Sequence, residues 1–420
     1  WRTILQVAKH HAQSPELDRS KNPNVEAVYP CTPAQRGILL NQMRNDTNYV
    51  THFIWEVNDL LLSQQDGPAV DLNRLASAWK QVVAWHAALR AAFQPDFTKD
   101  SQFEQVIFRN VEPPMVVLHV GVHDDQPGVP PASNTSCATV TRHDGQAVPH
   151  QFTICITPSG RVVCRLDINH VIIDAMSLAI LQRDLCRAYS ESTKGGTPND
   201  AYQKYVMFVQ EQPREEAVEY WRFYLEDMQP VSLPAPRATT EDVCPESLDL
   251  LEITLSHRGA DLETFCRSTD WTAPNLLYLA WALTLSAFTG ADDVCFGTFT
   301  SGRMIPIPHL DEEVGQFSNM SICRIRLASQ LTLDQIALSL QQNYSEVLSY
   351  QTFPLADIAT AAGVTMEDLA STAVNVQYAT PTVPSNQDKR PLLNLTPLHG
   401  LDPIPVSYPI PCDIFLVFDF

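Results

Sequence analysis

Positive charge is scarce in this chain of 420 residues, in which 28 Lys and Arg stand against 48 Asp and Glu and give a formal net charge of −20. Such an acidic balance disfavours nucleic acid or an anionic membrane surface as a partner. Long apolar runs are missing as well, since none reaches the roughly 18 residues of a membrane-spanning helix, and the N-terminal residues do not read as a signal peptide. We therefore expect a soluble, cytoplasmic protein that binds neither nucleic acid nor membrane.

Closely spaced cysteine pairs are absent too. The chain has 10 cysteines, and none of them has the spacing of a zinc ribbon or a redox site. Because free cysteine is among the most buried residue types, we interpret all of them as reduced core thiols rather than as a disulfide framework. The positions are Cys31, Cys137, Cys155, Cys164, Cys186, Cys244, Cys266, Cys295, Cys323 and Cys412. The sequence indicates no metal site and no phosphate-binding loop.

The length predicts two lobes, because 420 residues exceed one ordinary hydrophobic core. We expect a linker over residues 1–24, a first lobe over 25–195 and a second lobe over 196–420, with the junction in the Gly- and Pro-containing stretch "STKGGTPND". The chain begins with Trp instead of Met and ends in "CDIFLVFDF", which reads as a strand with no helix after it. We therefore expect a fragment of a larger polypeptide, whose second lobe lacks its last helix.

Mixed strands and helices predict an α/β fold for the first lobe. Thr32 and Pro33 have the residue types of a helix start before a short helix over 37–44. Alternation predicts a strand over 51–57, and apolar residues at helical spacing predict a long helix over 71–93. The other elements expected in this lobe are strands over 103–111, 114–122, 150–158 and 161–168 and a helix over 174–190.

The second half repeats this kind of pattern without visible sequence identity to the first. Two helices over 201–212 and 214–228 are expected to lead into it. Residues 381–411 are rich in proline, which favours a long surface loop. The remaining expected elements are strands over 248–256, 292–300, 318–327, 372–380 and 414–420, and helices from about 260, over 273–289 and over 332–351.

The stretch from Ile168 to Ser177, "INHVIIDAMS", joins an apolar strand to a histidine and to an acid that opens a helix. In the strand before it the even-numbered positions are apolar, so His170 would share the direction of the buried face if the alternation continued, and Asn169 would not. A lone interior histidine is most often a hydrogen-bonded core residue. Histidine is also the side chain best suited to exchange a proton near neutral pH.

Asp174 has two interpretations as well. An acid at this place can simply be the N-cap of the following helix. Alternatively, it holds the shape of the loop by pairing with a distant arginine, while the loop presents the imidazole of His170 at an internal cleft. The residues alone leave both alternatives open.

Six stretches, in the same order, resemble motifs of the condensation domains of nonribosomal peptide synthetases, and the resemblance extends from about residue 25 to the end. The family hallmark His-His-x-x-x-Asp-Gly stands here as Asn169-His170-Val171-Ile172-Ile173-Asp174-Ala175. The other five stretches are "YPCTPAQRGIL" (29–39), "WHAALRAAF" (85–93), "YWRFYL" (220–225), "DDVCFGTFTSGR" (292–303) and "VGQFSNMSICRIRL" (314–327).

Two positions depart from that hallmark. Asn169 replaces the first His and Ala175 replaces the Gly, which is similar to the Ser-His-x-x-x-Asp-Ala variant of fungal terminal condensation-like domains that release chains by cyclisation. Alanine at position 175 requires a backbone without positive φ. The heterocyclising subtype has two Asp residues in this motif and the epimerising subtype keeps both His residues, so both fit this sequence poorly.

The resemblance implies a fold like that of chloramphenicol acetyltransferase, with two α/β sandwich lobes in a V-shaped pseudo-dimer and His170 in a tunnel between them. His170 is then the catalytic residue, either as a base or as a group that orients the nucleophile. Asp174 would pair with Arg303 of the second lobe, and Asn169 and Ala175 would support the motif. For Arg303 the alternative is a solvated loop arginine.

Two more residues are candidate cleft residues. Ser177, or the backbone amide of Ala175, could stabilise an oxyanion, although a first-turn helix residue is the simpler interpretation of Ser177. Asn319 matches a family position near the cleft, with a plain strand-pairing role as the alternative. Arg90 is interpreted as a structural residue rather than a substrate contact.

We therefore expect a terminal condensation domain that releases a carrier-bound peptidyl thioester by intramolecular amide bond formation. The thioester would arrive on the phosphopantetheine arm of the upstream carrier domain of the same synthetase, with residues 1–24 as the linker from that domain, and the chain would bind no cofactor itself. Elongation between two carriers and release to a free amine or alcohol are alternatives. A noncatalytic relative that recruits other proteins is the alternative from a different class, and it would tolerate His170→Ala.

Overall fold

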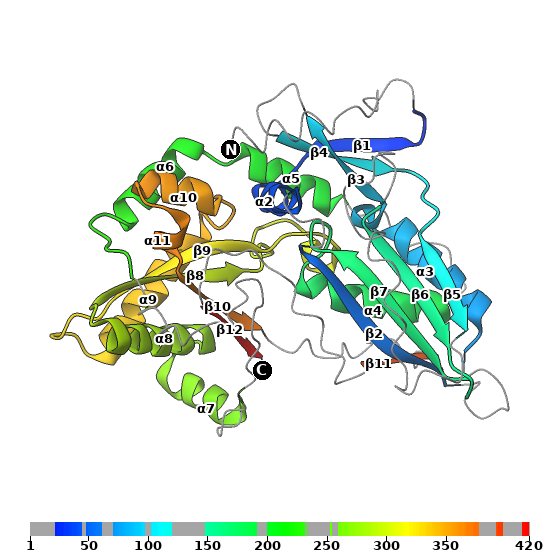
Figure 1. Ribbon diagram of the computed structural model, residues 1–420. Helices are drawn as coiled ribbons and strands as arrows, with labels where there is room; N and C mark the ends of the chain where they lie inside the picture. Colours follow the sequence, from blue (N-terminus) through cyan, green and yellow to red (C-terminus); the bar gives the residue numbers. More distant parts are fainter. Residues whose placement is uncertain are drawn as a thin grey trace, which may run out of the picture. The chain divides into compact units, whose positions relative to one another are not determined.

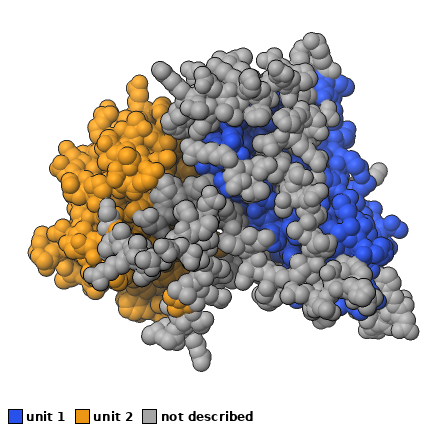
Figure 2. Space-filling view, viewed as in Figure 1, with its two compact units in different colours: residues 1–210, 306–317, 380–409 blue, residues 211–305, 318–379, 410–420 orange. Residues whose placement is uncertain are grey.

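The computed structural model describes residues 22–43, 48–60, 70–96, 102–119, 148–190, 200–231, 233, 253, 259–377, 392–397 and 414–419. The chain forms two compact units (Figure 2). Unit 1 comprises residues 1–210, 306–317 and 380–409, and unit 2 comprises residues 211–305, 318–379 and 410–420. The lobe boundary expected at 195 and 196 stays a prediction, and nearly all of the expected linker over 1–24 lies outside the described residues.

Unit 1 is built on a five-stranded sheet in the order β11-β2-β7-β6-β5 (Figure 1). β7 (Val162–Asn169) pairs antiparallel with β2 (Val50–Asp59) and with β6 (His150–Ile156). β5 (Met115–His119) runs parallel to β6. All eight residues of β7 are buried, as befits a central strand. The strands predicted over 51–57, 150–158 and 161–168 are confirmed.

Two helices, α3 (Leu72–Trp85) and α4 (Ala175–Ser190), bury their apolar residues in the main core of unit 1. Trp79 of α3 stacks on Phe152 of β6 with 4.7 Å between the ring centroids. Leu181 of α4 belongs to the same buried cluster. The even-numbered residues of β7 also face this core, which fixes the register of the strand that ends at the histidine motif.

The helix predicted over 71–93 is wrong beyond Trp85. His86 has an extended backbone, with φ −105° and ψ 116°, so α3 ends there. Residues 87–90 form a 3-10 turn that leads into β3 (Ala91–Asp96). The 3-10 turn ends at Arg90, which is buried and donates to the Phe108 carbonyl, in line with the structural role expected for it.

A second sheet of unit 1 has the order β1-β4-β3, and its strands are antiparallel. β4 (Gln102–Phe108) was predicted, whereas β1 (Val25–Pro30) was not. α2 (Pro33–Gln42) follows β1, and Thr32 is its N-cap as expected. The helix predicted over 201–212 is α5 (Ala201–Glu211).

The loop predicted over 381–411 is wrong in one segment. Residues Leu393–Pro397 form strand β11, which pairs antiparallel with β2 at the edge of the main sheet of unit 1. The rest of that loop except residue 392 lies outside the described residues, as does nearly all of the strand expected over 248–256.

Unit 2 is built on a four-stranded sheet in the order β12-β10-β8-β9. β8 pairs antiparallel with β9 and parallel with β10, and β10 is parallel to β12. These strands confirm four sequence predictions. Their bounds are β8 (Asp293–Thr300), β9 (Asn319–Arg326), β10 (Thr372–Gln377) and β12 (Ile414–Asp419).

Helices pack on both faces of this sheet. One buried cluster combines Phe296 of β8 with apolar residues of α8 and α9, and another combines Cys295 and Ile322 with Trp221 of α6 and with α10 and α11. The short helices α10 and α11 were not predicted. The bounds are α6 (Arg214–Tyr224), α7 (Gly259–Thr269), α8 (Ala273–Thr289), α9 (Leu333–Leu348), α10 (Leu355–Ala362) and α11 (Met366–Leu369).

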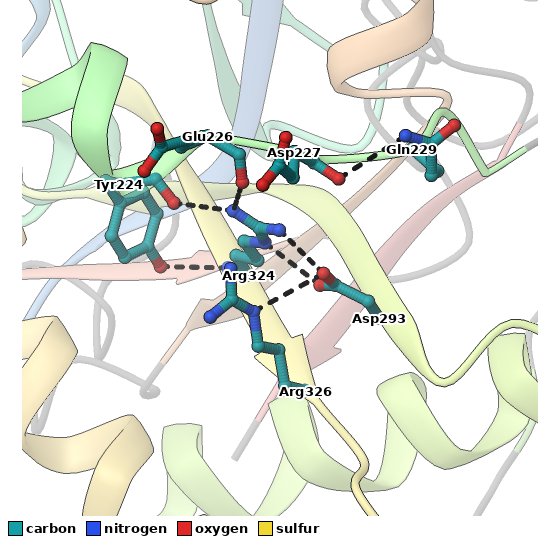
Figure 3. Close-up of polar contacts among 7 residues, drawn as sticks. All are labelled: Tyr224, Glu226, Asp227, Gln229, Asp293, Arg324 and Arg326. Carbon is teal, nitrogen blue, oxygen red and sulfur yellow. Dashed lines mark hydrogen bonds and ion pairs between the residues drawn. The ribbon is translucent and has the colours of Figure 1, made fainter.

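A buried guanidinium ties α6 to this sheet (Figure 3). Arg324 of β9 donates to the carboxylate of Asp293 on β8 at 2.9 and 2.6 Å. The same side chain donates to the backbone carbonyls of Tyr224 and Glu226 at 2.8 Å each, at the C-terminal end of α6. Carbonyls at the C-terminal end of a helix lack hydrogen-bond donors within the helix. Arg324 donates to them and thereby holds the end of α6 against the sheet.

Seven of the ten cysteines lie in the described residues, and all seven are free. Six of them are buried and Cys186 is half-buried, which confirms the interpretation as core thiols for these positions. Cys137, Cys244 and Cys412 lie outside the described residues. Across the described ranges, no helix has the length and apolar character that crossing a membrane would take.

Candidate active site

The turn that carries His170 is held in place by the strands on both sides of β7. The His170 N–H donates to the Tyr49 carbonyl at 2.8 Å, and the Asn169 N–H donates to the Pro149 carbonyl at 3.0 Å. Tyr49 has a positive φ of 62°, a conformation uncommon for a residue other than glycine. The ladder therefore continues to the end of β7, and the chain turns directly after it.

Asn169 shapes this turn with its side chain. Its Oδ1 accepts the Val171 N–H at 3.0 Å, and its carbonyl oxygen accepts the Ile172 N–H at 3.1 Å. A side-chain oxygen that binds the backbone two residues ahead forms an Asx turn, for which asparagine is well suited. Asn169 is fully buried and His170 is half-buried. Because both faces of β7 are buried, this burial does not decide the alternation expected at the strand end, which stays a prediction.

The imidazole of His170 is neutral near neutral pH. Burial lowers the pKa of His170 from 6.5 to about 4, although the charge of Asp174 and a hydrogen bond with the backbone of Ile173 act in the opposite direction. A neutral imidazole has one ring nitrogen that accepts a hydrogen bond. The ring therefore has one acceptor nitrogen, and it lies directly after the rigid strand β7.

Asp174 caps α4, as one of its two interpretations predicts. Its Oδ1 accepts the Ser177 N–H at 2.8 Å and lies 2.6 Å from the Ser177 hydroxyl oxygen. The same hydroxyl lies 3.0 Å from the Gly315 carbonyl oxygen and accepts the Gly315 N–H at 3.1 Å. Ser177 is fully buried and its hydroxyl is engaged by these groups, which favours a structural role over oxyanion binding. Ala175 begins α4 without positive φ, as expected.

The two predicted site residues of unit 2 are placed differently. Arg303 follows β8, is buried, and its backbone N–H donates to the Ser301 hydroxyl at 3.3 Å. Its pairing with Asp174 stays a prediction, because the two residues belong to different units. Asn319 begins β9, and its side-chain amide donates to the carbonyls of Gln351 and Phe353 at 2.8 and 3.2 Å. That is a structural role, and a cleft role for Asn319 stays a prediction.

Sequence reasoning missed the contacts that Tyr49 and Gln35 make with the turn, and of these two Gln35 binds it through its side chain. Gln35 of α2 donates from its side-chain amide to the Val171 carbonyl at 3.0 Å. The sequence signal was the spacing Thr32 to Gln35, which is typical of a helix capping box and gives no hint of a contact with a distant turn. Among the described residues, no three His, Cys, Asp or Glu side chains gather in a way that would hold a metal ion.

The model of the condensation domain family matches residues 25–392 of this chain. Nonribosomal peptide synthetases are among the similar proteins. One from Aspergillus violaceofuscus, ungA, is 35% identical over 84% of this chain, and nlsA from Emericella nidulans is 34% identical over 86%. A third, opaA from Aspergillus ustus, is 31% identical over 93% of the chain. The chain spans only 4%, 6% and 10% of the lengths of these three relatives, respectively.

Solved structures have the same fold. The first condensation domain of the CDA synthetase superimposes with a TM-score of 0.58 at 18% identity, covering 84% of this chain and 83% of that domain. A structure described as holo T3CT gives a TM-score of 0.59 at 19% identity, covering 89% and 79% of the two chains. The α/β fold expected from the sequence, like that of chloramphenicol acetyltransferase, is thereby confirmed, while the V-shaped arrangement of its lobes stays a prediction. On the family match and the identity to these synthetases, the chain belongs to the condensation domain family.

Proposed function

We propose that this condensation domain takes a peptidyl thioester from the phosphopantetheine arm of an upstream carrier domain and releases the peptide by intramolecular amide bond formation. The observation that carries the proposal is the position of His170, a half-buried residue on a turn held by backbone and side-chain hydrogen bonds. Asn169 and Ala175 support the cyclising subtype, because they resemble the Ser-His-x-x-x-Asp-Ala variant of terminal domains. Phosphopantetheine would belong to the carrier domain, and a cytoplasmic location stays a prediction.

The reaction forms one bond and breaks another at the same carbon. The free amine of the peptide attacks the thioester carbonyl carbon and forms the C–N bond. The nitrogen of the tetrahedral intermediate loses a proton as the centre collapses, the C–S bond breaks, and the leaving thiolate takes up a proton. The products are a cyclic amide and the free thiol of the carrier arm.

His170 would accept a hydrogen bond from the attacking amine. Because its pKa is about 4, the ring is neutral over the whole neutral range, and it is a weak base. Efficient proton abstraction needs a base whose pKa lies near the working pH. The low pKa therefore supports orientation of the amine as the main role of His170, and holding two reactants in place can lower a barrier by roughly 7 to 11 kcal/mol.

Asp174 and Arg303 would support the motif by charge. Both side chains are buried. Asp174 already accepts two hydrogen bonds from Ser177, which explain its role as a helix cap but do not neutralise its charge. A pairing between Asp174 and Arg303 would do so, and removal of either partner would then cost about 3 to 5 kcal/mol because the other charge stays buried.

Two other enzymatic roles use the same chemistry. In elongation a second carrier brings the amine, and in release to a free amine or alcohol the nucleophile diffuses in. A noncatalytic protein-recruiting relative is the alternative outside the enzymes. The neutral imidazole on a rigid turn supports a catalytic role, since a recruiting module has no need of it.

A panel of hexapeptidyl pantetheine thioesters with free amino termini tests the proposal. We expect wild-type protein to release cyclic peptide, which mass spectrometry distinguishes from linear acid by the loss of one water. We expect His170→Ala to lower the rate of cyclisation at least about tenfold, within the range of general acid-base or positioning groups. His119→Ala is the matched control, because His119 is an exposed histidine of β5 in the same unit.

Three results would contradict parts of this proposal. Cyclisation by His170→Ala at the wild-type rate would remove the catalytic assignment of His170. Cyclisation by wild-type protein no faster than the uncatalysed reaction would favour the recruiting alternative. Product that forms only when a second, aminoacyl-loaded carrier is added, or only with a free amine or alcohol, would replace cyclisation by one of the other enzymatic roles.

A further inference from the structure

Gln35 and Gln335 occupy the same place in two helices. The Thr32 N–H donates to Gln35 Oε1 at 2.9 Å, and the Thr332 N–H donates to Gln335 Oε1 at 2.9 Å, so each glutamine completes a capping box. A capping box uses only the side-chain oxygen. Gln335 is exposed, whereas Gln35 has 0% of its surface exposed. Because a buried amide group is costly unless it is hydrogen-bonded, capping alone does not account for the amino group of Gln35.

The amino group of Gln35 has two acceptors. Nε2 donates to the Val171 carbonyl at 3.0 Å and to the Tyr202 hydroxyl at 2.9 Å. Val171 is the residue directly after His170. The side chain of α2 therefore reaches the turn that carries the imidazole, although the helix lies far from that turn in the sequence.

The contact is part of a closed ring of three buried side chains. Tyr202 donates from its hydroxyl to Gln105 Oε1 at 2.8 Å, and Gln105 Nε2 donates to Gln35 Oε1 at 3.3 Å. Each hydroxyl or amide in the ring thus has a defined donor and acceptor role, so the amide of Gln35 has one orientation. Burial raises the pKa of Tyr202, which keeps the phenol protonated. Hydrogen bonds in such a network strengthen one another in a low-dielectric interior.

The ring completes the attachment of the backbone around His170. The Val171 peptide is bound on both sides, because its N–H donates to Asn169 Oδ1 and its carbonyl accepts from Gln35. The His170 N–H is bound to the Tyr49 carbonyl. With these bonds in place the Cα of His170 has little freedom, and the direction of the imidazole depends on the side-chain torsions alone.

We propose that Gln35 is a positioning residue, which through its ring with Tyr202 and Gln105 holds the Val171 carbonyl and thereby aims the imidazole of His170 at the reacting amine. This inference rests on the proposed function for its effect on turnover. Its structural part, that Gln35 fixes the imidazole, does not depend on which nucleophile is used. A misplacement of about 1 Å in a reacting group can cost on the order of a hundredfold in rate.

Gln35→Met tests the inference, because methionine keeps the length of the side chain and removes its hydrogen bonds. With the hexapeptidyl pantetheine thioester that wild-type protein releases fastest, we expect kcat to fall about tenfold to a hundredfold. We expect KM for the thioester to stay within about twofold, because Gln35 is fully buried and holds the turn without contact to the substrate. Gln335→Met is the matched control: it loses the same capping contact and should keep kcat within about twofold.

Nuclear magnetic resonance of histidine-labelled protein gives a readout that does not need turnover. We expect the ring signals of His170, assigned by their absence in His170→Gln, to move and broaden in Gln35→Met and to stay unchanged in Gln335→Met. Tyr202→Phe opens the ring but keeps Gln35 in place, so it should have a smaller effect on both readouts.

The outcomes separate this inference from the proposed function. Wild-type kcat and unchanged His170 signals in Gln35→Met would overturn the inference. If Gln35→Met does not fold, Tyr202→Phe takes its place, and wild-type values there would overturn the part of the inference in which the ring with Tyr202 and Gln105 fixes Gln35. If instead His170→Ala cyclises at the wild-type rate, the proposed function fails, and the His170 signals still decide whether Gln35 holds the imidazole.

Discussion

Ser177 and Gly315 contact each other through both backbone groups of the glycine. The Ser177 hydroxyl oxygen lies 3.0 Å from the Gly315 carbonyl oxygen and accepts the Gly315 N–H at 3.1 Å. The first turn of α4 is thereby attached to the segment over 306–317, which packs in unit 1. The approach has no room for a side chain, since a Cβ on Gly315 would lie 2.8 Å from ring carbons of both Phe317 and Tyr202.

Gly315→Ala is therefore expected to lower the free energy of unfolding by about 1 to 3 kcal/mol, the usual cost of overpacking. Gly37→Ala is the control of opposite sign. Gly37 lies in α2 with nothing within 4 Å of an added Cβ, so alanine should stabilise the protein by up to about 1 kcal/mol. Urea unfolding of the three proteins measures both effects. Equal stability of Gly315→Ala and wild type would contradict this prediction and show that the rings of Tyr202 and Phe317 can move aside without lowering the free energy of unfolding.

The stability of the fold is expected to fall as the pH drops from about 6.5 towards 4. His150 is fully buried, and burial lowers its pKa from 6.5 to about 4, although a hydrogen bond to the Leu89 carbonyl raises it. The pKa is lower in the folded state, so the unfolded state binds more protons over this range. Lowering the pH therefore stabilises the unfolded state relative to the folded state. The contribution of His150 to the free energy of unfolding is therefore fully present above pH 6.5, where it is worth up to about 3 kcal/mol, and it is lost as the pH falls towards 4. The lowered pKa of His170 acts in the same direction.

Urea unfolding at pH 7.0, 6.0 and 5.0 measures this slope. His150→Gln removes one titrating group from the core, so its stability should depend less on pH than that of wild type. His119→Gln is the control and should keep the wild-type slope, because His119 is exposed. A wild-type stability that does not change between pH 7 and pH 5 would contradict a neutral, buried His150.

Arg324→Met is expected to destabilise unit 2 by about 1 to 3 kcal/mol, because two carbonyls at the end of α6 lose their donor and the carboxylate of Asp293 keeps only Arg326 at 3.4 Å. Arg326 offers a matched control on the same strand. It lies 3.4 Å from the same carboxylate, but its side chain is 64% exposed. Arg326→Met should therefore change the free energy of unfolding by less than about 1 kcal/mol. Similar losses in the two variants would mean that Arg324 does not anchor α6.

The sequence predicted four of the five strands in the main sheet of unit 1 and the start of α4, because these segments have strong periodicity and Asp174 is a good helix cap. It failed at Leu89 and Phe93, which stand at helical spacing but lie in a 3-10 turn and a strand. No Gly or Pro interrupts that stretch, so only packing against β4 decides the outcome. β11 was missed because its residues adopt a strand conformation by pairing with β2, and a local sequence pattern does not reveal that pairing.

The candidate site was predictable in its residues and not in its contacts. Asp174 could be recognised as a cap because its partner lies three residues away. The partner of Val171 could not, since Gln35 lies on another helix and its amide is fixed by Tyr202 and Gln105. Side chains that meet across long sequence separations need the whole fold to be known.

The side chain of Asn169 is expected to tune both the stability of the turn and the rate of release. Its Oδ1 accepts the Val171 N–H at 3.0 Å, and a serine hydroxyl forms the same kind of turn more weakly. We therefore expect the free energy of unfolding to decrease in the order Asn, Ser, Ala for the residue at position 169. Asn169→Ala should lower it by about 1 to 2 kcal/mol, because the buried N–H of Val171 then lacks an acceptor. Thermal unfolding measures the stability.

The rate of release should follow the same order if the turn positions His170. Cyclisation of the hexapeptidyl thioester by Asn169→Ser should lie between those of wild type and Asn169→Ala. Asn394→Ala controls for the loss of an asparagine, because Asn394 lies exposed in β11 of the same unit. Asn169→Ala with normal turnover and lowered stability would separate the two effects, and would mean that the imidazole keeps its place through the Tyr49 and Gln35 contacts without the Asx turn.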